Sequence, residues 1–233
     1  MLIKYWHPSP KTFLIFDYFA AKPRCNLKLA AFLCCQNKFL RFMIALAARS
    51  GELLNYHSIA KDLAVCSDTI KHWLSILETS QIIYLLRPYS NNRLKWAIKT
   101  PKVYFMDTGL LAYLTAWTSP ETLMRGAQAG SIFETFIISE IVKSYLNAGI
   151  VRPSLFFYRD RDGKEIDLII EVEDQIYPIE IKLSAKPNAK MASHFRVLDQ
   201  VRDRNILRGT ILCQYPNKLF LSEDSLALPV HYI

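Results

Sequence analysis

The chain has 233 residues, a formal net charge of +8 and 51% hydrophobic residues. A chain this apolar can offset its ordering entropy by burial, which excludes an intrinsically disordered protein. Neither phosphate-binding pattern, G-x-x-x-x-G-K-[ST] or G-x-G-x-x-G, occurs in it. The sequence therefore argues against an ATPase or a nicotinamide-dependent enzyme. It also contains no uncharged apolar run of about 18 residues, so we expect no membrane span.

The distribution of charge and cysteine gives two further expectations. The five cysteines include no C-x-x-C pair, which indicates neither a disulfide framework nor a zinc site and favours a cytoplasmic location. Residues 1–35 carry five basic and one acidic residue, residues 36–125 eleven and six, and residues 126–233 thirteen and fourteen. Such an asymmetry is typical of a polyanion-binding module joined to a near-neutral one, although a contribution to solubility is the simpler interpretation.

Residues 36–118 show the element order of a winged helix-turn-helix domain. Apolar spacing predicts helices over residues 38–49, 56–64 and from Ser67 onward, then strands over residues 82–87 and 95–99. We expect Ser67 to cap the third helix. The predicted buried stripe of that helix consists of Ile70, Trp73, Leu74 and Leu77.

A winged helix that binds DNA places its third helix in the major groove and its wing tip on the backbone. The expected DNA contacts are then Lys71 and His72 on the helix and Arg93 and Lys95 in the wing. Winged helices also serve as protein-binding modules, so both kinds of partner stay open. The N-terminal segment, residues 1–35, is left unplaced.

A second domain is predicted over residues 126–233. A strand at residues 103–106 and a helix at 107–117, capped by Asp107-Thr108, precede it, and the Pro and Gly residues between 118 and 130 indicate a linker. The new domain opens with an apolar helix from Ser131 to about residue 149, and Glu134 falls on its apolar stripe. Either Glu134 forms a capping box with Ser131, or this carboxylate is buried for a functional reason.

Three strands follow this helix, at residues 155–158, 165–172 and 176–183. Ile166, Leu168, Ile170 and Val172 are expected on the apolar face of the second strand, with Glu165, Asp167, Ile169 and Glu171 on the other. A two-residue loop at 173–174 then sets a register in which the numbers of paired residues sum to 347.

In that register Asp167 lies opposite Glu180 and Glu165 opposite Lys182. Paired carboxylates are ligands that Mg²⁺ or Mn²⁺ prefers, and a metal with a nearby lysine suits phosphodiester hydrolysis. The alternative is a solvated sheet face with an ordinary Glu165–Lys182 ion pair. Ile169 on the same face indicates partial cover, most simply by the helix that bears Glu134, which would add a third carboxylate.

Glu134 on a helix, Asp167 on one strand and Glu180-Ile181-Lys182 on the next resemble the PD-(D/E)XK nuclease motif. The resemblance implies an α+β fold with an α-β-β-β-α-β core, whose last two elements would be a helix at residues 190–204 and a strand at 208–214. It implies that Asp167, Glu180 and Glu134 bind the metal. All three and Lys182 would be catalytic.

The chain from about Gln36 to its end also resembles the C-terminal region, a domain of unknown function, of a family of prokaryotic AAA-type ATPases. The resembling segments are residues 46–51, 69–74, 102–110, 133–134 and 165–169. The resemblance implies a missing Walker-type domain, so we expect a shortened or separated C-terminal half that is not an ATPase by itself and has a possible ATPase partner. Two functions stay open: a DNA-binding, Mg²⁺-dependent nuclease, and a non-catalytic DNA- or protein-binding regulatory module.

Overall fold

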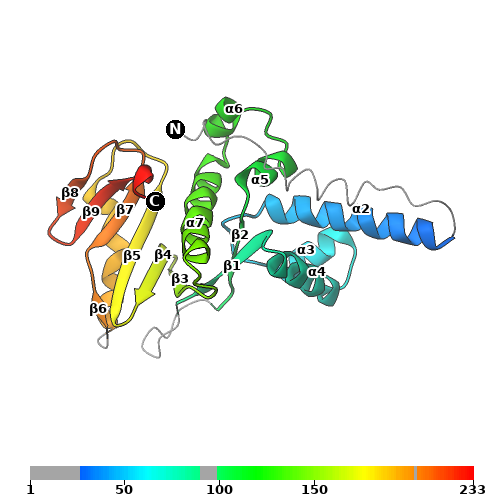
Figure 1. Ribbon diagram of the computed structural model, residues 1–233, viewed down its shortest axis with the longest axis horizontal. Coiled ribbons are helices and arrows are strands. Elements are labelled where there is room, and N and C mark those ends of the chain that lie inside the picture. Colours follow the sequence, from blue (N-terminus) through cyan, green and yellow to red (C-terminus); the bar gives the residue numbers. More distant parts are fainter. Residues whose placement is uncertain (1–26, 90–98, 202–203) are drawn as a thin grey trace.

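The computed structural model describes residues 27–89, 99–201 and 204–233, with side chains from Asn37 onward. Most of the unplaced N-terminal segment lies outside the described residues, as do Arg93 and Lys95. Figure 1 shows a helical part, from which α2 projects, beside a large mixed sheet. No helix in the described ranges combines the length and the apolar composition that a membrane crossing needs.

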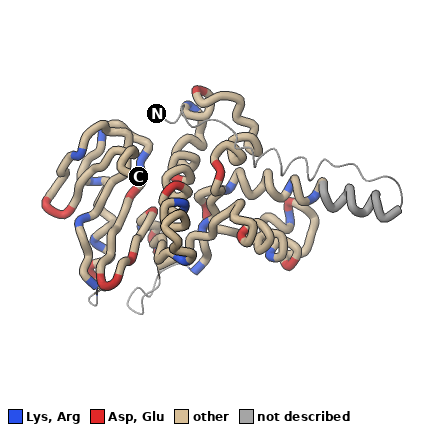
Figure 2. The backbone as a smooth tube through the Cα atoms, in the orientation of Figure 1, with Lys and Arg blue, Asp and Glu red and all other residues tan. Residues whose placement is uncertain are grey.

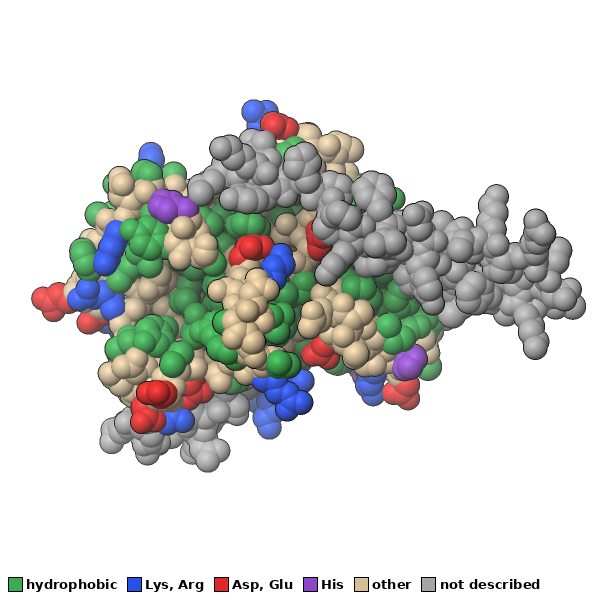
Figure 3. Space-filling model, in the orientation of Figure 1, with side chains coloured by type: hydrophobic (Ala, Val, Ile, Leu, Met, Phe, Trp, Pro, Cys, Tyr) green, Lys and Arg blue, Asp and Glu red, His purple; other side chains and the backbone are tan. Residues whose placement is uncertain are grey.

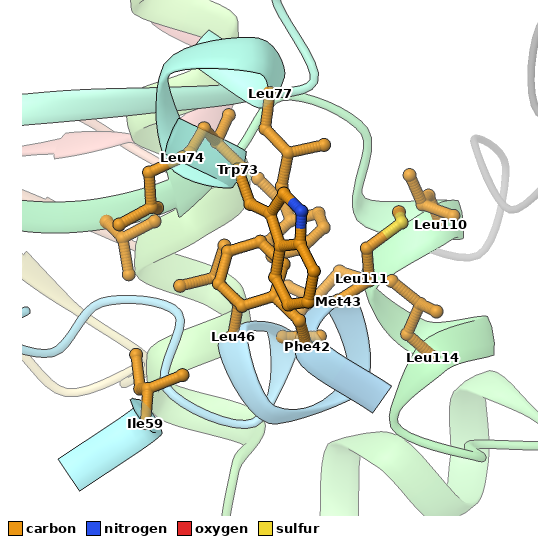
Figure 4. Packing of buried hydrophobic residues seen from close by; sticks show 14 of the residues in the cluster. Phe42, Met43, Leu46, Ile59, Trp73, Leu74, Leu77, Leu110, Leu111 and Leu114 are labelled. Atoms are coloured by element: carbon orange, nitrogen blue, oxygen red, sulfur yellow. The ribbon is translucent and has the colours of Figure 1, made fainter. Parts of the chain in front are cut away.

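Three helices form the first part: α2 (Leu27–Ala47), α3 (Tyr56–Leu63) and α4 (Ser67–Thr79). The expected stripe of α4 is buried, and Trp73 packs on Phe42 of α2 with ring centroids 5.3 Å apart (Figure 4). The predicted cap was wrong, because Cys66 holds the N-cap position without a side-chain hydrogen bond. Ser67 Oγ lies instead 3.1 Å from His57 Nδ1.

An antiparallel hairpin is formed by β1 (Ile83–Pro88) and β2 (Lys102–Phe105), with Ile83 opposite Phe105. The run at residues 103–106, predicted as a separate short strand, thus forms most of β2 and pairs with β1. Of the strand predicted over residues 95–99, residues 95–98 lie outside the described residues. Two short helices follow, α5 (Thr108–Leu114) and α6 (Pro120–Arg125). Asp107 caps α5 as expected, accepting a 2.9 Å hydrogen bond from the Leu110 amide.

The second part contains α7 and most of the sheet. Its elements are α7 (Ala129–Asn147), β3 (Leu155–Arg159), β4 (Glu165–Val172), β5 (Gln175–Lys182), the 3₁₀ helix η2 (Ala189–Gln200), β6 (Asn205–Ile206), β7 (Gly209–Cys213), β8 (Leu219–Ser222), β9 (Ser225–Pro229) and the 3₁₀ turn η3 (Val230–Tyr232). The elements from α7 to β7 occur in the expected order, with a 3₁₀ helix in place of the second α-helix.

One sheet joins both parts of the chain. Its strand order is β2-β1-β3-β4-β5-β7-β9-β8, with β6 beside β5. The seam lies between β1 and β3, which run parallel with Arg87 beside Phe156 and Pro88 beside Phe157. The β1–β2 hairpin is therefore an extension of the second part's sheet.

The sheet is covered on both faces. α7 packs on one face through a cluster that includes Phe133, Ile137, Leu168 and Ile179. η2 covers the other face, where Phe195 and Leu198 pack with Ile166, Ile169 and Ile176. The cover of Ile169 thus comes from η2, and the expectation that the helix bearing Glu134 covers it was wrong.

The register of the β4–β5 hairpin confirms the predicted sum, because Leu168 pairs with Ile179 and Val172 with Gln175. The predicted alternation along β4 was wrong at its start. Against β3, Ile169 pairs with Phe156 but Ile166 pairs with Tyr158, so two β4 residues oppose one on β3. This β-bulge falls at Asp167 and explains why Ile166 shares the η2 side with Ile169 while Leu168 lies under α7.

Candidate functional site

The predicted carboxylates and lysine meet where β5 ends and β4 begins. Lys182 Nζ lies 2.6 Å from Glu180 Oε1 and 3.6 Å from Asp167 Oδ2. Asp167 Oδ2 also accepts a 2.8 Å hydrogen bond from the Ile181 amide on the neighbouring strand. The side chains of Asp167 and Glu180 are 8% and 6% exposed, whereas that of Lys182 is 41% exposed. Two buried acids therefore lie beside a lysine that reaches solvent.

Glu134 extends the cluster from α7. The capping-box alternative is wrong, because α7 begins at Ala129 and Ser131 Oγ donates to the Gln128 carbonyl. Glu134 Oε1 instead accepts hydrogen bonds from Tyr104 Oη at 2.5 Å and Lys102 Nζ at 3.1 Å. The partly buried carboxylate of Glu134 is thus paired by side chains from the β1–β2 hairpin.

Lys102 and Tyr104 were missed in the sequence. Lys102 Nζ bridges Glu134 and Glu165, and it lies 5.6 Å from the ring centroid of Phe157. Both residues lie in one of the family-like segments, at residues 102–110, but that resemblance gave them no role. The apolar run Lys102–Phe105 begins with the lysine, and all four of its residues are buried. Their role follows from the position of β2 in the sheet rather than from a local motif.

The ion pairs of Glu165 also differ from the expected Glu165–Lys182 pair. Among the described residues, Glu165 pairs with Lys102 and with Arg159, whose Nη1 lies 3.2 Å from Glu165 Oε2. Lys182 pairs with Glu180 and Asp167. The bulge at Asp167 changes the side of the sheet to which the preceding side chains point. Glu165 therefore does not lie opposite Lys182.

The surroundings shift the pKa values of Glu180, Glu134 and Lys102. Burial and the nearby charge of Asp167 raise the pKa of Glu180 to about 8, although Lys182 acts in the opposite direction. Burial also raises the pKa of Glu134 against the attraction of Lys102, with a further contribution from Asp167. Burial alone would lower the pKa of Lys102, but the charges of Glu134, Glu165 and Asp167 raise it overall.

Asp167 and Glu180 fit a hard divalent cation. Within the described residues, Glu180 Oε2 is buried and has no hydrogen-bond partner. Mg²⁺ commonly binds one or two protein carboxylates and keeps several waters. No group of three or more His, Cys, Asp or Glu side chains in the described ranges is arranged to hold a metal, so Glu134 as a third ligand stays a prediction.

The expected DNA-contact residues of α4 lie at the surface. Lys71 and His72 are exposed. Lys71 Nζ pairs with Asp68 Oδ1 at 2.9 Å, so part of its charge is neutralised. The wing residues Arg93 and Lys95 lie outside the described residues, and the contact set stays a prediction.

A cavity of about 800 Å³ opens beyond the ends of β5, β7 and β9. It is lined from α7 by Phe133, Phe136 and Glu140, from the end of β7 by Cys213 and from η3 by His231. Figure 2 shows acidic and basic positions interleaved along α7 and the adjacent segments of the same chain. Ligands of open sheets commonly bind beyond the carboxyl ends of parallel strands, which is where this cavity lies.

Comparison with known proteins divides the chain into two regions. Residues 35–121 match a family described as a domain of unknown function, DUF8612, and residues 129–233 match a second one, DUF4143. Uncharacterized proteins of Mycobacterium bovis and Mycobacterium tuberculosis are each 26% identical over 189 residues, covering 81% of this chain. The chain spans only 41% of the length of these relatives.

One similarity to a solved structure is weak. The crystal structure of a MepR mutant from a multidrug-resistant S. aureus clinical isolate has a TM-score of 0.27 and 19% sequence identity, covering 62% of this chain and 97% of that one. A TM-score of this size carries no argument about the fold.

Proposed function

We propose that the chain binds DNA and hydrolyses phosphodiester bonds at a divalent-metal site formed by Asp167 and Glu180. The observation that carries this proposal is the buried Glu180 oxygen, which has no hydrogen-bond partner in the described part of the chain. A buried acceptor left unpaired is costly, and a bound cation would satisfy it. The element order from α7 to β7, with the 3₁₀ helix η2 where the expected core has its second α-helix, and the resemblance to PD-(D/E)XK nucleases support the same reaction.

The residues of the site have distinct proposed roles. The Ile181 amide fixes Asp167, which with Glu180 would hold Mg²⁺ or Mn²⁺. When bound, such an ion polarises a phosphate oxygen and lowers the pKa of a coordinated water. Lys182 reaches solvent and would donate to the attacking water or to the phosphate oxygen that gains charge. Glu134, held by two hydrogen bonds, would assist as a further carboxylate.

A plasmid-nicking assay with Mg²⁺ or Mn²⁺ tests the reaction. We expect the wild type to nick DNA, and Asp167→Asn and Lys182→Met to lose at least about 100-fold of that rate, a typical effect of removing an electrostatic catalytic group. Lys143→Met is the matched control, since Lys143 pairs with Glu140 on the half-exposed surface of α7. Equal cutting by all four proteins, or none by the wild type across metals and DNA forms, would refute the proposal.

DNA binding is proposed for the first part of the chain. The order of α2, α3, α4 and the β1–β2 hairpin supports a winged helix. Figure 3 shows basic side chains grouped at the lower edge of the face in view, a surface that would favour contact with a polyanion. Lys71, His72, Arg93 and Lys95 would contact the phosphates or bases. Changing these four residues to Ala should reduce DNA retention at low salt, and unchanged retention would exclude them as the contacts.

A non-catalytic binding or regulatory module is the second candidate. The observation that favours it is the internal charge pairing, because Lys102 and Lys182 already pair with the carboxylates of the cluster. This candidate predicts that Mg²⁺ leaves thermal stability unchanged. A real site should stabilise the fold by about 2.7 kcal/mol when the free metal concentration is 100 times Kd.

We also propose a AAA-type ATPase as a partner, on the strength of the resemblance and of the greater length of the relatives. Co-expression with the protein of the neighbouring upstream reading frame, followed by size-exclusion chromatography, tests this partner. Co-elution with a Walker-type ATPase is the expected result, and separate elution of the two proteins contradicts it.

A further inference from the structure

Lys102 holds an unusual position for a lysine. Its side chain is 4% exposed, and its ammonium contacts both Glu134 and Glu165. The ring of Phe157 lies on another side of the ammonium, with its centroid 5.6 Å away. Few lysines are buried this deeply, and those that are need paired charges around them.

The ion pairs divide the cluster into two halves. In the closed half, Lys102 and Arg159 balance Glu134 and Glu165, and Tyr104 adds a hydrogen bond to Glu134. The open half contains Asp167 and Glu180 with Lys182, which leaves one net negative charge when both acids are ionised. The carboxylate oxygen without a partner belongs to this open half.

We propose that the Lys102 ammonium takes the place that a second divalent cation would fill between Glu134 and Glu165, so that the site holds at most one metal ion. The metal of the open half rests on the proposed function. The role of Lys102 in the closed half is a separate claim with its own test.

The burial of Lys102 explains why a metal ion would not displace it. Lys182 is 41% exposed, so its ammonium can turn into solvent when a cation arrives. Lys102 lacks that freedom, because leaving Glu134 and Glu165 would strand its charge among apolar groups. The closed half is therefore fixed as an ammonium site, while the open half can exchange its cation.

The number of bound Mn²⁺ ions tests this role on the full chain. Isothermal titration calorimetry and the paramagnetic resonance signal of free Mn²⁺ both report that number. We expect Lys102→Met to bind one more Mn²⁺ per chain than the wild type. Lys143→Met, which removes a half-exposed lysine from another Glu–Lys pair, should bind the same number as the wild type.

A second variant and a folding measurement cover the other outcomes. Lys102→Met combined with Glu134→Gln should lose the extra ion. If Lys102→Met is unfolded without metal, Mn²⁺ should restore its near-ultraviolet circular dichroism. A folded Lys102→Met with no extra ion, or an unfolded one that Mn²⁺ does not restore, overturns the role of Lys102. If the wild type binds no Mn²⁺ and Lys102→Met binds one ion per chain, the result supports the role of Lys102 and refutes the Asp167–Glu180 metal site.

Discussion

Replacing Glu180 with glutamine should stabilise the protein, and the gain should grow with pH. The pKa of Glu180 is raised to about 8 from an ordinary value of 4.5. A carboxyl group with a raised pKa binds its proton more tightly in the native state than in the unfolded state. Its contribution to stability is therefore complete below pH 4.5 and is lost as the pH rises to 8.

The size of the effect follows from the two pKa values. Each pKa unit corresponds to about 1.36 kcal/mol, so the wild type loses on the order of 3 kcal/mol between pH 4.5 and 7 and about 5 kcal/mol by pH 9. Glu180→Gln resembles the protonated acid in shape and never ionises. It should match the wild type near pH 4.5 and exceed its free energy of unfolding by these amounts at higher pH.

Urea denaturation in metal-free buffer between pH 4.5 and 9 measures this difference. Glu78→Gln is the control, because Glu78 is exposed on α4 and its replacement should give no comparable pH-dependent gain. Excess Mg²⁺ should narrow the gap between Glu180→Gln and the wild type, since a cation stabilises the ionised acid. A Glu180→Gln variant that is less stable than the wild type at pH 8, or equally changed at every pH, would refute the reasoning.

Three further predictions concern the hydrogen bonds, packing and surface charge described above. Tyr104→Phe removes the 2.5 Å hydrogen bond to the carboxylate on α7 and should cost about 1.5 to 3 kcal/mol in urea denaturation; no loss would mean that this bond is not formed. Gly209→Ala would place Cβ 2.1 Å from the aromatic ring packed on β7 and should cost about 1 to 3 kcal/mol, whereas Gly130→Ala meets open space within α7 and should gain up to about 1 kcal/mol. Thermal denaturation compares Gly209→Ala with Gly130→Ala, and equal shifts of Tm in the two variants would contradict the packing of the aromatic ring on Gly209. Asp68→Asn releases Lys71 from its ion pair, so DNA retention at low salt should rise; unchanged retention argues against α4 as a contact.

Local patterns predicted the hairpin that carries the acids. The apolar alternation of β5 and the two-residue loop after Val172 leave one register that buries both apolar faces, and Leu168 pairs with Ile179 accordingly. The same holds for Asp107, whose carboxylate caps the helix that follows it. These features depend on neighbours within a few residues, which a single sequence displays.

Features fixed by distant partners were not predictable. The run from Glu165 to Val172 reads as a regular strand, and the bulge at Asp167 exists only because Tyr158 and Phe156 of β3 pair with Ile166 and Ile169. The start of α7 was also misplaced, because its first turn includes Gly130, which lowers helix propensity. In both cases tertiary packing outweighed the local preference.

The contribution of the β1–β2 hairpin to the site could not be predicted without the pairing of distant strands. Lys102 contacts Glu134, 32 residues away, because β1 joins β3 and so fixes β2 beside α7. Nothing in the spacing of the first part indicates a parallel pair with a strand in the second. A lysine beside an apolar strand is usually a surface residue, so the residue type alone does not indicate that Lys102 is buried.

The seam between β1 and β3 limits how the chain can be recombined. Lys102 lies within the DUF8612 match and Glu134 within the DUF4143 match, although the two side chains form one ion pair. A chimera that takes residues 129–233 from one relative and the β1–β2 hairpin from another must therefore bring a matching base and acid across the seam. We expect natural recombination and engineered grafts of this region to transfer both parts together.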